Sequence, residues 1–338
     1  MQVQATRSSF KHIAGALLAI ALLAMMLSAC ASTDHWPQSG PDSHSLPQRV
    51  LLEDVPFYPQ ERFQCGPASL AMTLNSQGLT TNPDVLRELV YIPGREGTLQ
   101  VELIAAGRAH NFLVYQLDGT LDSLLKELAA GNPVLVMQNL RFGWWPQWHF
   151  AVAVGFDAEE RTLILNTDTR KHYEAPIRAF INTWGRADNW AVVMLPPDQV
   201  PATAEPLKFL DAGYDLESTG QTLAAMTAYQ TAEQQWPNQP AAVFGQGNLA
   251  YDMGNRKQAV RHFSRMVTRF PDIAEGWNNL GHTLGELGCR QQATEAQLCA
   301  SRLAPLRFSA PAEVEPPDEI APEYCSIPDC PQTPVTGE

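Results

Sequence analysis

Basic residues are scarce in this chain of 338 residues, which carries 23 Lys and Arg against 36 Asp and Glu. The formal net charge is −13 at neutral pH. This balance argues against nucleic acid as a partner, because binding to a phosphate backbone relies on clustered positive charge. It also argues against electrostatic docking on an anionic lipid surface.

The sequence also lacks a hydrophobic run of the length typical of a membrane-spanning helix. The apolar run from Ile13 to Leu27 is shorter than the roughly 20 residues that cross a bilayer. Arg7 and Lys11 precede it and small residues follow it, which predicts a secretory signal peptide over residues 1–29. Its removal would leave 21 basic residues against 36 acidic ones, a charge of −15.

The end of this segment resembles the lipobox of bacterial lipoproteins, in the sequence LSAC from Leu27 to Cys30. The resemblance implies cleavage before Cys30 and lipid on its sulfur, which would anchor a soluble body to a membrane without spanning it. Ala31 follows where an Asp would direct such proteins elsewhere, which implies the outer membrane. We therefore expect a lipid-anchored protein of the bacterial cell envelope, on the periplasmic face of the outer membrane.

Cysteine is sparse, and the six cysteines divide into three groups. Cys30 is assigned to lipid, and an even set near the C-terminus predicts two disulfides in an exported protein, with three pairings open. That set lacks the paired cysteine and histidine spacing of a zinc site, so we predict no metal and no cofactor. Cys65 is left unpaired in an oxidising compartment, which favours a function for its thiol. The disulfide candidates are Cys289, Cys299, Cys325 and Cys330.

Composition divides the chain into segments of different character. Helical patterns over residues 65–78, 83–92, 98–112 and 120–131 come first, and short β-branched runs at 133–140, 149–157, 162–167 and 190–195 follow, which predicts an α+β domain. The predicted segments are a signal peptide (1–29), a lipidated tether (30–50), the α+β domain (51–197), a linker (198–206), three repeats (207–306) and a Pro-rich acidic tail (307–338).

The C-terminal part repeats with a period of 34 residues, the length of a tetratricopeptide repeat. Small residues recur where two helices would cross closely, and proline recurs where the second helix of each pair would end. This pattern predicts an all-α array of three repeats, which either braces the preceding domain or binds an extended substrate or a protein partner in its groove. The matching columns are Gly213, Gly247 and Gly281, then Ala225, Ala259 and Ala293, then Pro237, Pro271 and Pro305.

Cys65 lies at the predicted start of a helix, since Pro67 is favoured in a first turn. The partial positive charge at a helix N-terminus would lower the pKa of a cysteine there. A thiol nucleophile needs a base, and His149 opens an apolar strand where its ring would be held in place. Asp168 ends the next strand and would orient the imidazole, with the amide of Asn166 as the alternative.

These residues together resemble the papain-like bacteriocin-processing peptidases, which are cysteine peptidases that cut double-glycine leaders. The resemblance is carried by VPFYPQERFQCGPASLAM, then HFAVAVGF, then an acid on the following strand, and it covers residues 51–197. It implies a papain-like fold with Cys65 as nucleophile, His149 as base and Asp168 as the orienting acid. The oxyanion-hole glutamine of the family falls on Gln60.

The sequence departs from the family pattern at three points. Gln60 lies five residues before Cys65 rather than six, and Asp168 is followed by Thr169 rather than by proline. The third departure is that the ABC transporter usually joined to the family's peptidase does not accompany residues 51–197, so leader cleavage is not carried over. The whole resembles stand-alone lipoproteins that pair such a domain with tetratricopeptide repeats.

Three tryptophans precede His149 in the sequence RFGWWPQWHF. Trp144, Trp145 and Trp148 would either form an aromatic wall that binds a peptide or pack over the edge of the domain or against the repeats. The sequence leaves these two readings open.

The sequence as a whole predicts a lipid-anchored cysteine peptidase with an α+β papain-like domain and an all-α repeat array. Its expected partners are a peptide or protein substrate, a protein bound by the repeats and a membrane reached through Cys30. Three alternatives stay open: an inactive peptidase-like binding scaffold, an acyl or amide transferase on the same residues, and a purely structural assembly lipoprotein.

Overall fold

The computed structural model of the chain describes residues 36, 46–60, 64–311 and 322–331. The predicted signal peptide, Cys30 and most of the tether lie outside these residues. The architecture below is that of the unit formed by residues 39–338. None of the helices in the described ranges combines the length and apolarity that crossing a bilayer requires.

A seven-stranded antiparallel sheet forms the centre of the N-terminal domain. Its order is β2-β7-β3-β4-β5-β6, and β1 pairs with the second half of β4 beyond the end of β3. The strands are β1 (Arg49–Leu51), β2 (Leu113–Gln116), β3 (Val134–Asn139), β4 (Trp148–Asp157), β5 (Thr162–Thr167), β6 (Arg170–Pro176) and β7 (Ala191–Leu195).

The close approach of β1 to β4 depends on a glycine. A Cβ atom added at Gly155 would lie 2.1 Å from the carbonyl oxygen of Val50, so no larger residue fits there. The register of β4 against β5 also shifts between Ala153 and Gly155. With this irregularity, the long β4 strand pairs with three neighbours, which are β3, β1 and β5.

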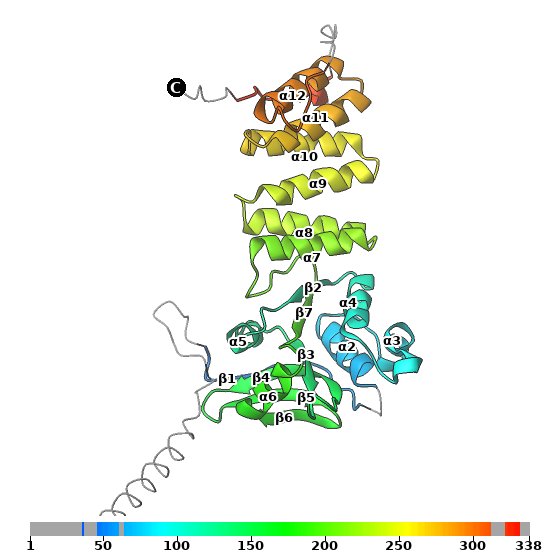
Figure 1. Ribbon diagram of the computed structural model, residues 1–338, viewed down its shortest axis with the longest axis vertical. Helices are drawn as coiled ribbons and strands as arrows, with labels where there is room; N and C mark the ends of the chain where they lie inside the picture. The colour runs from blue at the N-terminus through cyan, green and yellow to red at the C-terminus, as the bar shows by residue number, and fades with distance from the viewer. Residues whose placement is uncertain (1–35, 37–45, 61–63, 312–321, 332–338) are drawn as a thin grey trace, which may run out of the picture. The chain divides into compact units, whose positions relative to one another are not determined.

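Helices cover both faces of the sheet, because its central strands are apolar on both faces. Helices α2 (Cys65–Ser76), α3 (Pro83–Val90) and α4 (Gln100–Ala109) share one core with Phe150 and Val152 of β4. Figure 1 shows these three helices grouped together beside the sheet. Helix α6 (Ile177–Gly185) lies against the other face, where Thr183 accepts a hydrogen bond from Gln138 of β3. Helix α5 (Leu121–Ala129) and the short 3-10 helix η1 (Pro93–Arg95) complete the domain.

Local signals in the sequence set several of these boundaries. The hydroxyl of Thr120 accepts a hydrogen bond from the N–H of Ser123 and caps α5. Gly78 and Gly131 follow α2 and α5 with positive φ angles of 90° and 91°, which glycine adopts without strain. The predicted α+β class is confirmed, while β1, β2, β6 and α6 are elements that the sequence analysis did not identify.

Six α-helices lie in the described part of the C-terminal region, and they repeat with the predicted spacing. Helices α7, α9 and α11 begin at residues 206, 240 and 274, and α8, α10 and α12 begin at 222, 256 and 290. Gly247 of α9 lies where Phe263 of α10 crosses it, since an added Cβ would be 2.4 Å from that ring. Their bounds are α7 (Pro206–Ser218), α8 (Thr222–Gln235), α9 (Pro240–Asp252), α10 (Arg256–Arg269), α11 (Ala274–Glu286) and α12 (Arg290–Leu303).

The linker after β7 is tied to the N-terminal domain through one buried carboxylate. Glu127 of α5 is fully buried and accepts hydrogen bonds from the N–H and hydroxyl of Thr203 at 2.8 and 2.6 Å. It also accepts one from the N–H of Ala202 at 3.2 Å. This part of the predicted linker therefore has a defined path.

Two disulfides connect the tail to the last helix pair. Cys289 pairs with Cys325 and Cys299 pairs with Cys330, which selects one of the three pairings that the sequence left open. Cys325 ends the short 3-10 helix η2 (Glu323–Cys325) and packs with Phe263 and Trp277 in the core of the helical region. Cys65 is the free cysteine of the residues that the structure describes.

Candidate active site

Cys65 is the first residue of α2, as the sequence predicted. Gln64 precedes the helix with non-helical backbone angles, and Pro67 lies in the first turn, where its missing N–H has no intrahelical partner to lose. Gly66 touches the segment before α4, because an added Cβ there would lie 2.6 Å from Cβ of Thr98. The start of α2 is therefore packed directly against residues that wall the site.

The environment of Cys65 differs from the prediction in its effect on acidity. Burial raises the pKa of the Cys65 thiol above its ordinary value, because a thiolate loses solvation there. Backbone hydrogen bonds from Phe150, Gly66 and Cys65 itself act in the opposite direction without reversing the shift, and the charge of Asp168 adds to the increase. The expected lowering by the helix N-terminus is thus outweighed by burial.

His149 lies at the start of β4 and is 7% exposed. It stands directly opposite Gln138 of β3, so both side chains are on the face of the sheet that α6 covers. Burial lowers the pKa of His149, the charge of Asp168 raises it, and that of Arg170 lowers it. Burial therefore favours the neutral form of both Cys65 and His149 in the resting site.

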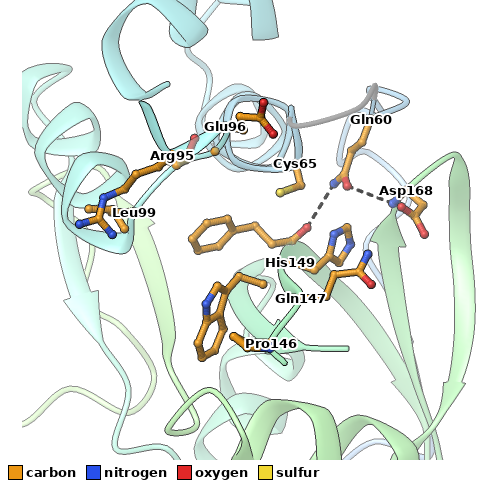
Figure 2. A pocket seen from close by; sticks show the side chains of 13 residues that line it. Gln60, Cys65, Arg95, Glu96, Leu99, Pro146, Gln147, His149 and Asp168 are labelled. Carbon is orange, nitrogen blue, oxygen red and sulfur yellow. Dashed lines mark hydrogen bonds between the residues drawn. The ribbon is translucent and has the colours of Figure 1, made fainter. Parts of the chain in front are cut away.

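One cavity of about 770 Å³ brings these two residues together. Figure 2 shows Cys65 at the start of its helix and His149 on the facing strand, with Gln60 and Asp168 beside them. Arg95 and Glu96 of the segment before α4 form another wall. The remaining lining residues are Gly97, Thr98, Leu99, Pro146, Gln147, Trp148 and Phe150.

Asp168 lines this cavity but its carboxylate is directed elsewhere. It occupies the tight turn between β5 and β6 with a positive φ of 51°, and its side chain is 55% exposed. Among the described residues, its carboxylate pairs with Arg170 at 3.5 Å and makes no hydrogen bond to His149. The charge of Asp168 acts on His149 through space only.

Gln60 connects the turn of Asp168 to β4. Its side-chain oxygen accepts from the N–H of Asp168 at 3.1 Å, and its backbone N–H donates to the carbonyl of Asp168 at 2.8 Å. Its amide nitrogen lies 3.3 Å from the carbonyl oxygen of Phe150 and 3.2 Å from the hydroxyl of Ser69. Both are long hydrogen bonds that a negatively charged oxygen in the cavity could replace.

The structure places Asn166 away from His149. Asn166 stands directly opposite Val152, which belongs to the core shared with α2, so its side chain lies on the other face of the sheet. It is fully buried, and its oxygen accepts from the N–H of His172. Asn166 therefore does not orient the imidazole, which corrects the alternative left open by the sequence.

Thr167 contacts the imidazole instead, and the sequence analysis did not identify it. Its Oγ1 lies 2.7 Å from Nε2 of His149, and Thr167 is 4% exposed. Successive side chains of a strand point to opposite faces of the sheet, so Asn166 and Thr167 of β5 cannot both face His149. This alternation is the signal that could have identified Thr167. Using that signal required the register of β4 against β5.

The comparisons with known proteins concern the domain that holds this cavity. Residues 52–192 match the family described as Peptidase_C39 like. These residues form a C39-like peptidase domain. Such a domain is that of a cysteine peptidase, a hydrolase whose substrate is a peptide or a protein. The C-terminal helices lie outside the match, and no curated protein matches the chain.

Two solved structures are similar to the C39-like peptidase domain. A Bacillus anthracis protein described as a C39-like peptidase is 18% identical, with 44% of this chain and 98% of that chain covered and a TM-score of 0.37. The other is the peptidase domain of Streptococcus ComA, described as a bi-functional ABC transporter involved in a quorum sensing pathway. It is 20% identical, with 42% of this chain and 98% of that chain covered and a TM-score of 0.34. These similarities are too distant to bear on the activity.

The tryptophans of the C39-like peptidase domain are exposed rather than packed over its edge. Trp144, Trp145 and Trp148 are 79%, 62% and 52% exposed. The ring of Trp144 stacks on that of Phe142 and meets Trp145 edge to face, while Trp148 lines the cavity of Cys65. An apolar surface of this kind next to the cavity of a free cysteine suits contact with a peptide.

Proposed function

We propose that the chain is a lipid-anchored cysteine peptidase of the bacterial envelope that hydrolyses a peptide bond at Cys65. The observation that carries the proposal is the shared cavity of Cys65 and His149 in a domain that matches the C39-like family. A thiol at a helix start and an imidazole held on a strand form the nucleophile and base of a covalent mechanism.

The reaction begins with transfer of the thiol proton from Cys65 to His149 as the sulfur attacks the carbonyl carbon. Because burial favours the neutral pair, proton transfer accompanies the attack rather than preceding it. The tetrahedral oxyanion accepts hydrogen bonds from the N–H of Cys65 and from the amide nitrogen of Gln60.

Collapse of this intermediate breaks the carbon–nitrogen bond. His149 donates its proton to the leaving amine, which departs with a free amino group and leaves a thioester on Cys65. His149 then takes a proton from water, and the resulting hydroxide attacks the thioester. The thiolate leaves and recovers the proton from His149, so the site returns to its starting state with one water consumed.

The helical region supplies a second surface for this function. We take its helices as three tetratricopeptide repeats, a proposal supported by their 34-residue spacing. A hollow of about 380 Å³ is lined by Tyr214, Asn248 and Asn279, with the acids Glu217 and Asp252 beside them. Such a surface suits a segment of a substrate or partner protein that presents amides and basic side chains.

The proposal assigns membrane attachment to the lipid anchor and substrate contact to the exposed tryptophans. Lipid on Cys30 would hold the protein at the periplasmic face of the outer membrane. Trp144, Trp145 and Trp148 would contact apolar side chains of the substrate next to the scissile bond, which is supported by their exposure and by the place of Trp148 in the cavity.

One observation favours a second function, that of a binding scaffold without activity. Asp168 does not bond to His149, and burial raises the pKa of Cys65, so the site lacks the charged pair of an activated thiol. A transferase on the same residues would differ only in the group that accepts the acyl chain.

Cleavage of a peptide library separates these functions. The full mature chain with Cys30→Ser, which needs no lipid, would be incubated with mixed peptides, and new amino termini would be identified by mass spectrometry. We expect cleavage that Cys65→Ala and His149→Ala abolish, with His110→Ala as a matched control because His110 bonds to Ala106 of its own helix. Cleavage that persists in Cys65→Ala would refute the proposal, and binding without cleavage would establish the scaffold.

A further inference from the structure

We propose that Thr167 orients the imidazole of His149, so that a neutral hydroxyl occupies the place that an acid was expected to fill. This inference rests on the proposed function, because it concerns how the base of that reaction is held. Thr167 acts through His149 and is therefore a positioning residue.

The geometry of the contact carries the inference. Oγ1 of Thr167 and Nε2 of His149 are 2.7 Å apart, and both residues are more than nine-tenths buried. They lie on neighbouring strands, β5 and β4, whose backbone pairing limits their movement. A bond at Nε2 leaves Nδ1 as the nitrogen that exchanges a proton with Cys65.

The two residues predicted for this role are directed elsewhere. The carboxylate of Asp168 is more than half exposed and pairs with Arg170. Asn166 lies on the opposite face of the sheet and bonds to the N–H of His172. Among the residues that the structure describes, Thr167 is thus the hydrogen-bond partner of the His149 side chain.

A hydroxyl in this place has chemical consequences that a carboxylate would not have. It accepts from Nε2–H both in the neutral tautomer, whose free Nδ1 can take the proton of Cys65, and in the imidazolium, so it holds the ring without adding charge. The imidazolium formed during attack is stabilised by the charge of Asp168 at longer range and opposed by Arg170. The titratable groups around His149 are Cys65, Arg95, Glu96, Asp168, Arg170 and Tyr173.

A second cavity gives room for a direct test. It measures about 190 Å³ and is lined by His149, Thr167 and Gln138, among others. An aspartate at position 167 has one more side-chain heavy atom than threonine, and this cavity can take it. Thr167→Asp would therefore place a carboxylate against Nε2 and stabilise the imidazolium.

The experiment measures alkylation of Cys65 by iodoacetamide against pH, because this needs no knowledge of the substrate. The protein is the full mature chain with Cys30→Ser and its disulfides intact. We expect Thr167→Val to slow alkylation near pH 7 by roughly five- to tenfold, the effect of removing one hydrogen bond of ordinary strength. Thr167→Ser retains the hydroxyl and should stay within about twofold of the wild type.

Two further variants make the pH profile decisive. Thr167→Asp should speed alkylation and move its inflection to lower pH, because the added charge favours the thiolate–imidazolium pair. Asp168→Asn should slow alkylation less than Thr167→Val does, since the carboxylate of Asp168 does not touch the ring. A merely structural role for Thr167 would leave the pH profile of Thr167→Val equal to that of the wild type.

The outcomes distinguish this inference from the proposed function. A profile of Thr167→Val equal to the wild type, with a large loss in Asp168→Asn, would overturn the inference and assign the role to Asp168. If the pH profile of His149→Ala were also equal to that of the wild type, the proposed Cys65–His149 pair itself would be refuted. Should Thr167→Val not fold, an unshifted inflection in Thr167→Asp would still overturn the inference.

Discussion

Replacing Gly66 by alanine tests how tightly the start of α2 is held against the wall of the site. The added Cβ would lie 2.6 Å from both Cβ and Oγ1 of Thr98, and 2.9 Å from its Cγ2. These distances are shorter than van der Waals contact, and Thr98 is branched at Cβ, which restricts its escape to another rotamer. The clash must therefore shift either Thr98 or the first turn that carries Cys65.

The magnitude follows from two opposing effects. Overpacking costs roughly 1–3 kcal/mol, while exchanging a helical glycine for alanine gains at most about 1 kcal/mol. We expect Gly66→Ala to lower the free energy of unfolding by about 1–2 kcal/mol. Gly285→Ala in α11 is the matched control, because its Cβ would lie at an ordinary 3.8 Å from that of Ala293. It should gain about 0.5–1 kcal/mol from helix propensity.

Urea unfolding of each variant measures this difference, and the iodoacetamide rate of Cys65 reports the shift at the site. Adding Thr98→Gly to Gly66→Ala removes the clashing atoms, so the pair should be more stable than the sum of the two single changes. A Gly66→Ala protein as stable as the wild type, with an unchanged alkylation rate, would refute the packing argument.

Three further predictions concern acidity, the linker and the tail. Because burial raises the pKa of Cys65, the folded state holds this proton more tightly than the unfolded state, so stability should fall as pH rises above the ordinary value of 9.0. In urea titrations above this pH, Cys65→Ser should remove the part of the decrease in the free energy of unfolding that the thiol causes. Glu127→Ala should lower stability by roughly 2–3 kcal/mol by leaving the donors of Thr203 unpaired, and protease should then cut the linker faster; an unchanged cleavage rate would contradict this. Cys299→Ser with Cys330→Ser should cost the helical region about 2–4 kcal/mol and leave Cys65 alkylation unchanged. Equal thermal unfolding of variant and wild type would count against that disulfide.

Elements with a local cause could be predicted from the sequence. The helix start at Cys65 follows from Pro67 and the apolar run behind it, and the cap of α5 follows from Thr120. The 34-residue period predicted the spacing of six helices, because each repeated glycine or proline acts on its own helix pair. Each of these signals lies within a few residues of the feature it sets.

Other predictions required contacts between distant segments. The partner of His149 depends on the register of β4 against β5, and one residue along β5 reverses the face on which a side chain lies. The sequence analysis therefore placed the orienting group in the correct segment. It named Asp168 and Asn166, which are the two neighbours of the residue that contacts the imidazole. The choice among three disulfide pairings likewise depended on where the tail folds back.

The sequence by itself determined the class of the site: a cysteine at a helix start and a histidine on an apolar strand, in an α+β domain. Only the tertiary structure decided the direction in which burial shifts the pKa values of that site, and which side chain contacts its imidazole. The physical reason is that solvation and cross-strand contact depend on segments far apart in the chain. Burial by those segments reversed the expected effect of the helix N-terminus on Cys65.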